Sequence, residues 1–80
     1  MNASNIIKSI RNKYGYSQDN MAEMLKITRQ SYNKLENNPT KASLDKVYAI
    51  FNMLNEDIDE FLNALKQDYM SQRNDKNKEE

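Results

Sequence analysis

Apolar residues recur along this chain mainly at intervals of three and four, the spacing that places side chains on one face of an α-helix. No stretch alternates apolar and polar residues as a half-buried strand does, so the sequence predicts an all-α fold. The first helix is expected over residues 4–14, with Ser4 as its N-cap. Its apolar face consists of Ile7, Ile10 and Tyr14. Gly15, the only glycine, follows where a left-handed residue commonly ends a helix.

Two shorter helices are expected within residues 17–37. Ser17 and Thr28 are both N-cap residue types, and the break between the helices falls at Lys26 and Ile27. The inward faces are Met21, Ala22 and Leu25 in the first helix and Ser31, Tyr32 and Leu35 in the second. Two short helices joined by a break of about three residues must cross steeply, and the small Ala22 side chain permits close contact there. The spacing therefore predicts a helix-turn-helix.

A turn and a fourth helix follow. Residues 37–40 (NNPT) have turn chemistry, because Pro39 cannot continue a helix. The fourth helix is expected to start near Ser43, and Asn55 can adopt the left-handed conformation that ends it. Its apolar stripe consists of Leu44, Val47, Phe51 and Leu54, with Ile50 beside it. The pattern is that of one amphipathic helix.

The last predicted helix begins at a capping box from Asp57 to Glu60. Its apolar stripe consists of Ile58, Phe61, Leu62, Leu65 and Tyr69. Residues 70–80 have almost nothing to bury, so a disordered tail or a frayed helical extension is expected there. The sequence thus predicts one domain in residues 1–69, a compact bundle of four or five short helices, followed by a charged, disordered tail at residues 70–80.

The composition excludes several kinds of chemistry. The chain has no histidine and no cysteine, which removes disulfides, thiolate and imidazole nucleophiles and the common zinc sites. No nucleophile has an identifiable base beside it, so we expect no enzyme activity, no metal and no cofactor. The acidic cluster at residues 56–60 lacks calcium-loop spacing and fits helix capping better. No apolar run is long enough for a signal peptide or a membrane span, and a cytoplasmic protein is expected.

The charge distribution changes the picture, because a net charge of zero by itself counts against nucleic-acid binding. Residues 1–41 carry seven basic and three acidic residues, a net charge of +4. Residues 42–80 carry five basic and nine acidic residues, a net charge of −4. The first half is therefore the candidate surface for phosphate, although charge alone fits a solvated surface without function equally well.

The second helix of the predicted helix-turn-helix has an outward face rich in hydrogen-bond donors. This face consists of Arg29, Gln30, Asn33, Lys34 and Asn37, none of which is acidic. In the major groove of DNA, Arg and Lys match guanine O6 and N7, whereas Gln and Asn match adenine N6 and N7. Alone, such residues more often form a solvated face, and the surrounding motif favours base contacts here.

That motif has several parts. Its positions are Ser17, Gln18, Met21 and Ala22 in the first helix, Ile27 and Thr28 in the turn, and Leu35 and Glu36 at the end of the second helix. With these positions the chain resembles the lambda-type phage repressor and Cro family, also called the XRE family of bacterial regulators. Residues 43–45 (SLD) and 54–62 (LNEDIDEFL) resemble later stretches of that family. The resemblance covers about residues 6–65 and implies a lambda repressor-like fold.

The resemblance also implies a role for each residue of the predicted site. The base-contacting residues would be Arg29, Gln30, Lys34 and Asn33. The phosphate-contacting residues would be Gln18, Thr28, Asn37, Lys41 and Arg11. Gln18 would in addition support the base-reading helix, and Arg11 and Glu36 occupy positions that pair in some relatives.

Three positions depart from the family pattern. Lys26 stands where the turn usually has glycine, and a left-handed lysine costs about 1 kcal/mol relative to glycine. Tyr32 replaces the usual Ile or Val, so its hydroxyl must reach water or a partner. Pro39 stands earlier than the family's usual proline, which leaves the shape of this loop open.

The function implied by the resemblance is sequence-specific binding of double-stranded DNA by a bacterial or phage-encoded transcriptional repressor. One domain reads only a few base pairs, so we expect a homodimer on a pseudopalindromic operator. The dimer interface is expected at Ile58, Phe61, Leu62, Leu65 and Tyr69. Two alternatives stay open: an antitoxin of the same fold that also binds a toxin protein, and a protein-interaction module that keeps the fold without the DNA function. A toxin or a regulatory protein is thus a possible partner.

Overall fold

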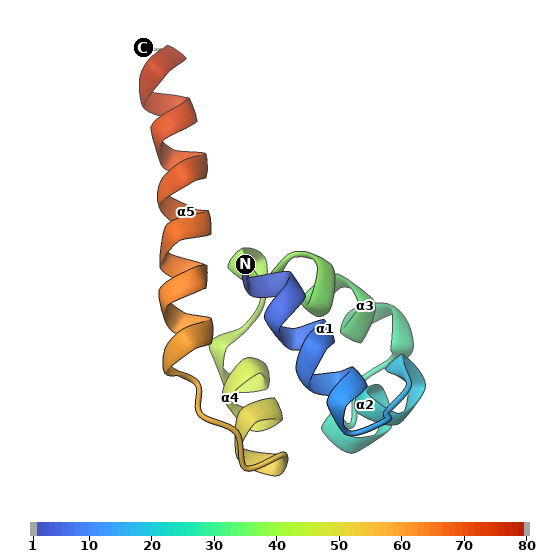
Figure 1. The fold of residues 1–80 in the computed structure, drawn as a ribbon. Helices are drawn as coiled ribbons and strands as arrows, with labels where there is room; N and C mark the ends of the chain where they lie inside the picture. Colours follow the sequence, from blue (N-terminus) through green and yellow to red (C-terminus); the bar gives the residue numbers. More distant parts are fainter. Residues whose placement is uncertain (1, 80) are drawn as a thin grey trace.

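A computed structural model describes the backbone of residues 2–79 and the side chains of residues 2–71. Its elements are α1 (Ala3–Lys13), α2 (Gln18–Leu25), α3 (Arg29–Asn37), the 3-10 turn η1 (Pro39–Lys41), α4 (Leu44–Met53) and α5 (Asp59–Glu79). Residues 2–79 contain no strand, and the predicted all-helical bundle with a helix-turn-helix is confirmed. In Figure 1, α1–α4 gather together, and α5 lies beside α1 before it extends past the bundle.

The first helix begins earlier than the sequence predicts. Asn2, not Ser4, is the N-cap: its side chain accepts the N–H of Asn5 at 2.8 Å. The predicted apolar face is also wrong at Tyr14, which is 40% exposed. Tyr14 occupies the C-cap, where the chain leaves the helix, and its hydroxyl donates to the carbonyl of Leu54 at 3.0 Å. A polar tip at a helix end therefore joins α1 to the end of α4.

The predicted left-handed positions are confirmed by positive backbone φ angles. Gly15 has φ 72°, Lys26 has φ 59° and Asn55 has φ 53°. At the C-cap of α2, the N–H of Lys26 bonds the carbonyl of Glu23, which satisfies one of the free carbonyls at the helix end. Three of the four turns between α-helices thus depend on one residue with positive φ.

Each α-helix contributes one face to the core. Its buried apolar members are Ala3, Ile6, Ile7, Met21, Ala22, Leu25, Tyr32, Leu35, Val47, Ile50, Phe51, Leu54, Phe61 and Ala64. The rings of Phe51 and Phe61 lie 5.2 Å apart and join α4 to α5. Two predicted inward positions are wrong: Ser31 is exposed and hydrogen-bonds Thr28, and Leu44 is 51% exposed at the first turn of α4. The inward face of α3 is instead Tyr32, Leu35 and Glu36, an i, i+3, i+4 set.

The last helix begins at Asp59, whose N–H bonds the carboxylate of Asp57 at 2.9 Å. Asp68 accepts the N–H of Ala3 at 3.0 Å and ties α5 to the start of α1. The backbone is helical through Glu79, whereas the side chains of residues 72–80 lie outside the described part of the chain. The domain boundary at residue 69 stays a prediction. Within the described residues, no helix is both long and apolar enough to cross a membrane.

Candidate nucleic-acid interface

The outward face of α3 carries the predicted base-contacting residues together. Arg29, Gln30, Asn33, Lys34 and Asn37 are all exposed. Thr28 caps the helix as predicted, because its side chain accepts the N–H of Ser31 at 3.0 Å. The face is therefore a row of amide and cationic groups that begins at the capped N-terminus of α3.

Beneath this face, a fully buried carboxylate holds α3 against α1. Glu36 is 0% exposed, and Arg11 donates to it from Nε at 2.8 Å and from Nη2 at 3.3 Å. The third guanidinium nitrogen of Arg11 donates to the carbonyl of Tyr16 at 3.0 Å. The pair that the family resemblance implies is present, and it fixes α3 relative to α1 and the turn after it.

Two more side chains complete the partners of Glu36. The hydroxyl of Tyr32 donates to it at 2.7 Å and the amide of Gln18 donates to it at 3.0 Å. Burial opposes ionisation of Glu36, yet the hydrogen bonds from Arg11, Tyr32 and Gln18 together lower its pKa below the ordinary value. Burial and the bond to Glu36 raise the pKa of Tyr32. The hydroxyl at this unusual tyrosine thus has a charged partner inside the domain.

These bonds bear on two predicted phosphate contacts. Gln18 links α2 to α3, because it bonds both Glu36 and Asn33. Arg11 directs three nitrogens into the domain, which assigns it an internal positioning role. A phosphate contact by either side chain stays a prediction.

Arg29 has an acidic neighbour that the sequence did not single out. Its Nε lies 3.5 Å from a carboxylate oxygen of Asp19, and both side chains are 67% exposed. An ion pair this exposed contributes little, since water and salt screen it. Arg29 can therefore leave Asp19 for another hydrogen-bond acceptor at small cost.

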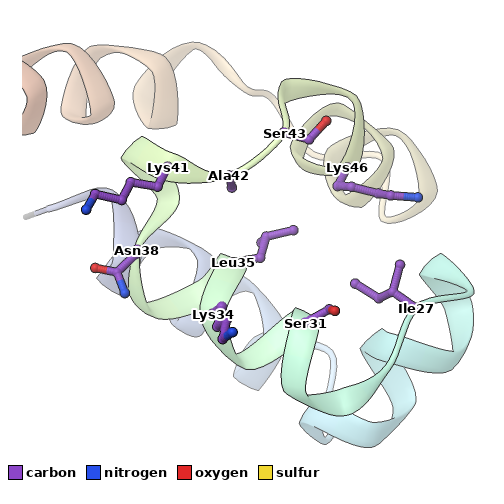
Figure 2. A pocket seen from close by; sticks show the side chains of 9 residues that line it. All are labelled: Ile27, Ser31, Lys34, Leu35, Asn38, Lys41, Ala42, Ser43 and Lys46. Atoms are coloured by element: carbon purple, nitrogen blue, oxygen red, sulfur yellow. The ribbon is translucent and has the colours of Figure 1, made fainter.

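A shallow hollow of about 500 Å³ lies between α3 and the start of α4. Figure 2 shows Ile27, Leu35 and Ala42 in this hollow. Its edges carry three lysines, Lys34 from α3, Lys41 from η1 and Lys46 from α4. Pro39 is buried and starts η1, and this local fold brings the exposed Lys41 to the edge.

Sequence reasoning missed Lys46 as a site residue, although one signal was available. Lys46 lies three residues after Ser43 and off the apolar stripe of α4, so it had to be exposed. That it borders the same hollow as Lys34 follows only from the tertiary packing. The three lysines extend the cationic surface from the outward face of α3 to its flank.

A helix-turn-helix family model matches residues 7–61, which is more than half of the chain and runs from α1 to the first turns of α5. The chain belongs to this family, the helix-turn-helix regulators of lambda repressor and Cro type. Membership makes it a DNA-binding protein of the transcription-regulator type. No curated protein and no solved structure matches the chain.

The fold buries one part of the predicted dimer surface and leaves the other part accessible. Phe61 is fully buried in the domain core, which leaves it no accessible surface for a second chain. Ile58, Leu62 and Leu65 are half-buried, and Tyr69 is 57% exposed. An apolar groove of about 380 Å³ runs along this side of α5, and Leu44 and Met70 line it together with Leu62, Leu65 and Tyr69. Leu44 and Met70 were not part of the predicted interface.

Proposed function

We propose that this protein is an operator-binding transcriptional repressor that inserts α3 into the major groove of double-stranded DNA. This proposal rests mainly on one observation. An exposed row of side chains lies on α3, and the buried Glu36 on the opposite face fixes this helix in the domain; the row consists of Arg29, Gln30, Asn33 and Lys34. Each of these four side chains matches a base edge, and a rigid support keeps them in register. The row therefore reads bases.

Phosphate contacts on either side of the groove position the helix. Gln18 and Thr28 lie at the starts of α2 and α3, where free N–H groups and the helix dipole favour an anion. Asn37 and Lys41 lie at and just after the other end of α3, and Lys46 adds a cation at the edge of the hollow that Lys41 also lines. Such contacts carry no sequence information, but they set the orientation of the protein on the duplex.

We further propose that the repressor acts as a homodimer on a pseudopalindromic operator, with the α5 groove as its interface. Leu44, Leu62, Leu65, Tyr69 and Met70 give this side of the domain a continuous apolar surface. A two-fold interface uses the same patch on both subunits, and an apolar helix face packs well on its own copy. Sedimentation equilibrium tests this proposal, and a Leu65→Glu variant is expected to dissociate the dimer and weaken binding to the two-half-site operator.

Selection of bound fragments from random double-stranded DNA tests the proposed function. The expected result is a conserved site of two inverted half-sites, with centres about 10 base pairs or one helical turn apart, or a multiple of that spacing. A matched control carries Arg29→Ala and Gln30→Ala and leaves the core untouched. Recovery of no preferred sequence by the native chain, or of the same sequence by the control, contradicts the proposal.

The same α5 groove also supports a second candidate, an antitoxin that binds a toxin protein as well as its operator. Tyr69 and Met70, which line this groove, are both about half-exposed. A toxin bound there would compete with the second copy for the groove. Dissociation of the homodimer by a protein encoded beside this chain, with α3 still free to bind DNA, would favour the antitoxin.

A further inference from the structure

A chain of side-chain amides runs from the buried carboxylate to the exposed face of α3. Gln18 Nε2 donates to Glu36 Oε1 at 3.0 Å. Asn33 Nδ2 donates to Gln18 Oε1 at 3.3 Å, and Asn37 Nδ2 donates to Asn33 Oδ1 at 3.2 Å. Three amides in series thus connect the domain core to the surface that faces DNA.

The direction of this chain follows from the chemistry of its buried end. An ionised carboxylate accepts hydrogen bonds and donates none, so Gln18 must turn its NH2 group toward Glu36. The Gln18 oxygen then faces Asn33, which has to present its own NH2 group. The Asn33 oxygen in turn faces Asn37 and accepts from it. Each amide therefore has one consistent orientation, set by Glu36 at the start.

A fixed amide orientation distinguishes base pairs that a freely turning amide treats alike. Asn recognises adenine by donating to N7 and accepting from the N6 amino group. Exchanging the A·T pair for T·A moves adenine to the other strand and reverses the order of these two groups across the groove. An amide that turns over by 180° can follow the reversal. An amide held in one direction matches only one of the two pairs.

We propose that Glu36 is a positioning residue for specificity, which fixes the direction of the Asn33 amide through Gln18 and so makes the protein discriminate A·T from T·A at one operator position. The inference rests on the proposed function, in which α3 reads bases. Asn33 has the remaining capacity for this contact, because one N–H and one oxygen lone pair stay free after its two internal bonds. Its exposure places that capacity on the DNA side.

The test compares two variants that both remove a partner from the buried cluster. Glu36→Gln replaces the acceptor-only group by one that also donates, which lets the Gln18 and Asn33 amides turn over. Tyr32→Phe deletes one hydrogen bond to Glu36 but keeps the carboxylate, so the direction is retained. Asn33→Ala first locates the operator position that this side chain reads. Affinity is then measured for DNA with A·T and with T·A at that position.

The native protein and Tyr32→Phe are expected to prefer one of the two pairs by about tenfold, within the range of a bidentate amide–adenine contact. Glu36→Gln is expected to reduce the preference to about twofold. A merely structural role would lower stability and affinity on both DNAs and leave the ratio unchanged. The proposal is overturned if Glu36→Gln leaves the ratio unchanged, or if Tyr32→Phe loses as much of the base-pair preference as Glu36→Gln. It is also overturned if Asn33→Ala relaxes the base preference at no operator position.

A second variant and a second measurement cover the case in which Glu36→Gln does not fold. Gln18→Met interrupts the series of amide hydrogen bonds at a half-exposed position. It is expected to reduce the ratio of the A·T and T·A affinities in the same way, whatever it does to overall affinity. In NMR spectra of the free protein, the Asn33 side-chain NH2 group is expected to show NOE contacts to the Gln18 side chain, because it donates to the Gln18 oxygen. Absence of these contacts in the native protein overturns the inference. Failure of the proposed function looks different, because the native protein would then show no base preference at any position.

Discussion

At the scale of single residues, this domain keeps two groups in unfavourable states and compensates both locally. Lys26 adopts a left-handed conformation that glycine adopts without strain. Glu36 is a buried charge, and it is accompanied by one cation and two neutral donors. Both residues lie within the helix-turn-helix, at the turn before α3 and on its inner face. Strain and buried charge are therefore concentrated around α3, the helix proposed to read DNA.

Replacing Lys26 by glycine is expected to stabilise the domain by about 1 kcal/mol, because the left-handed strain of a side-chain-bearing residue is removed. Lys26→Ala is the matched control, since it removes the same charge and keeps the strain. Urea unfolding at one pH measures both free energies. Equal stability of the two variants would show that the turn stores no strain at this position.

Stability is expected to fall with acid in a way that depends on Glu36. The pKa of Glu36 is lower in the folded state, so its contribution is complete above the ordinary glutamate pKa of about 4.3 and is lost as pH falls through the folded value. Melting temperatures from neutral to acid pH measure this slope, and Glu36→Gln is expected to flatten it. Glu56→Gln is expected to flatten it less, because Glu56 pairs with the exposed Lys13 and solvent screens that pair. An unchanged acid slope in Glu36→Gln would contradict the assignment.

At the scale of elements, α3 and α5 differ in how far the rest of the fold supports them. α3 contacts α1, α2 and η1, so its exposed face has a fixed orientation. α5 contacts α1 and η1 in its first turns and then leaves the bundle. A short supported helix suits base reading, whereas a long helix with a free apolar side suits contact with another chain.

Replacing Gln30 by alanine is expected to cost roughly 1–3 kcal/mol on the cognate site and much less on random DNA, since a base contact matters only where the matching base is present. Lys41→Ala is expected to weaken both DNAs alike, because a phosphate contact is independent of sequence. Affinities on both DNAs at one salt concentration decide the matter. Equal losses of affinity for Gln30→Ala on the two DNAs would contradict the assignment of α3 as the base-reading helix.

Truncation after Tyr69 is expected to leave folding and operator affinity nearly intact, because Met70, at the end of the groove, is the one apolar residue among residues 70–80. The melting temperature is expected to change by less than about 4 °C, which corresponds to under about 1 kcal/mol for a domain of this size. Thermal melts and gel shifts measure the two properties. A large loss of either would mean that this segment pairs with the domain or with a partner chain.

At the scale of the whole molecule, opposite charges are divided between the two halves of the chain. Residues 1–41 carry a net charge of +4 and include α1–α3, whereas residues 42–80 carry −4 and include α4 and α5. The basic half contains the proposed DNA surface. An acidic remainder lowers non-specific attraction to DNA and leaves the cationic row to orient the approach.

Binding is expected to weaken steeply with salt, because lysine and arginine side chains release counterions from the phosphates that they neutralise. For a dimer, the slope of log K against log salt concentration is expected to be more negative than about −4. Gel shifts or fluorescence anisotropy on the selected site give the slope. Lys46→Ala, which removes one flanking cation per subunit, is expected to make it shallower, and a flat titration of the native protein would contradict DNA binding altogether.

Local sequence signals determined most of the secondary structure. The caps Ser17 and Thr28, the left-handed positions Gly15, Lys26 and Asn55, and the extent of the helix-turn-helix are all present as the sequence predicts. These features depend on interactions within four or five residues, which a side chain and its near neighbours decide by themselves. The outward face of α3 followed in the same way, because helical periodicity separates it from the apolar face.

Only the tertiary structure decided which residues gather from distant parts of the chain. Arg11 and Gln18 reach Glu36 from 25 and 18 residues away, and the resemblance implied the first contact but not the second. Burial of a glutamate, exposure of Leu44 and the presence of Lys46 at the same hollow as Lys34 all depend on how the elements pack together. Periodicity shows which side of a helix is apolar, but the angles and offsets between helices result from the combined shape of many side chains. No single segment of the sequence contains that information.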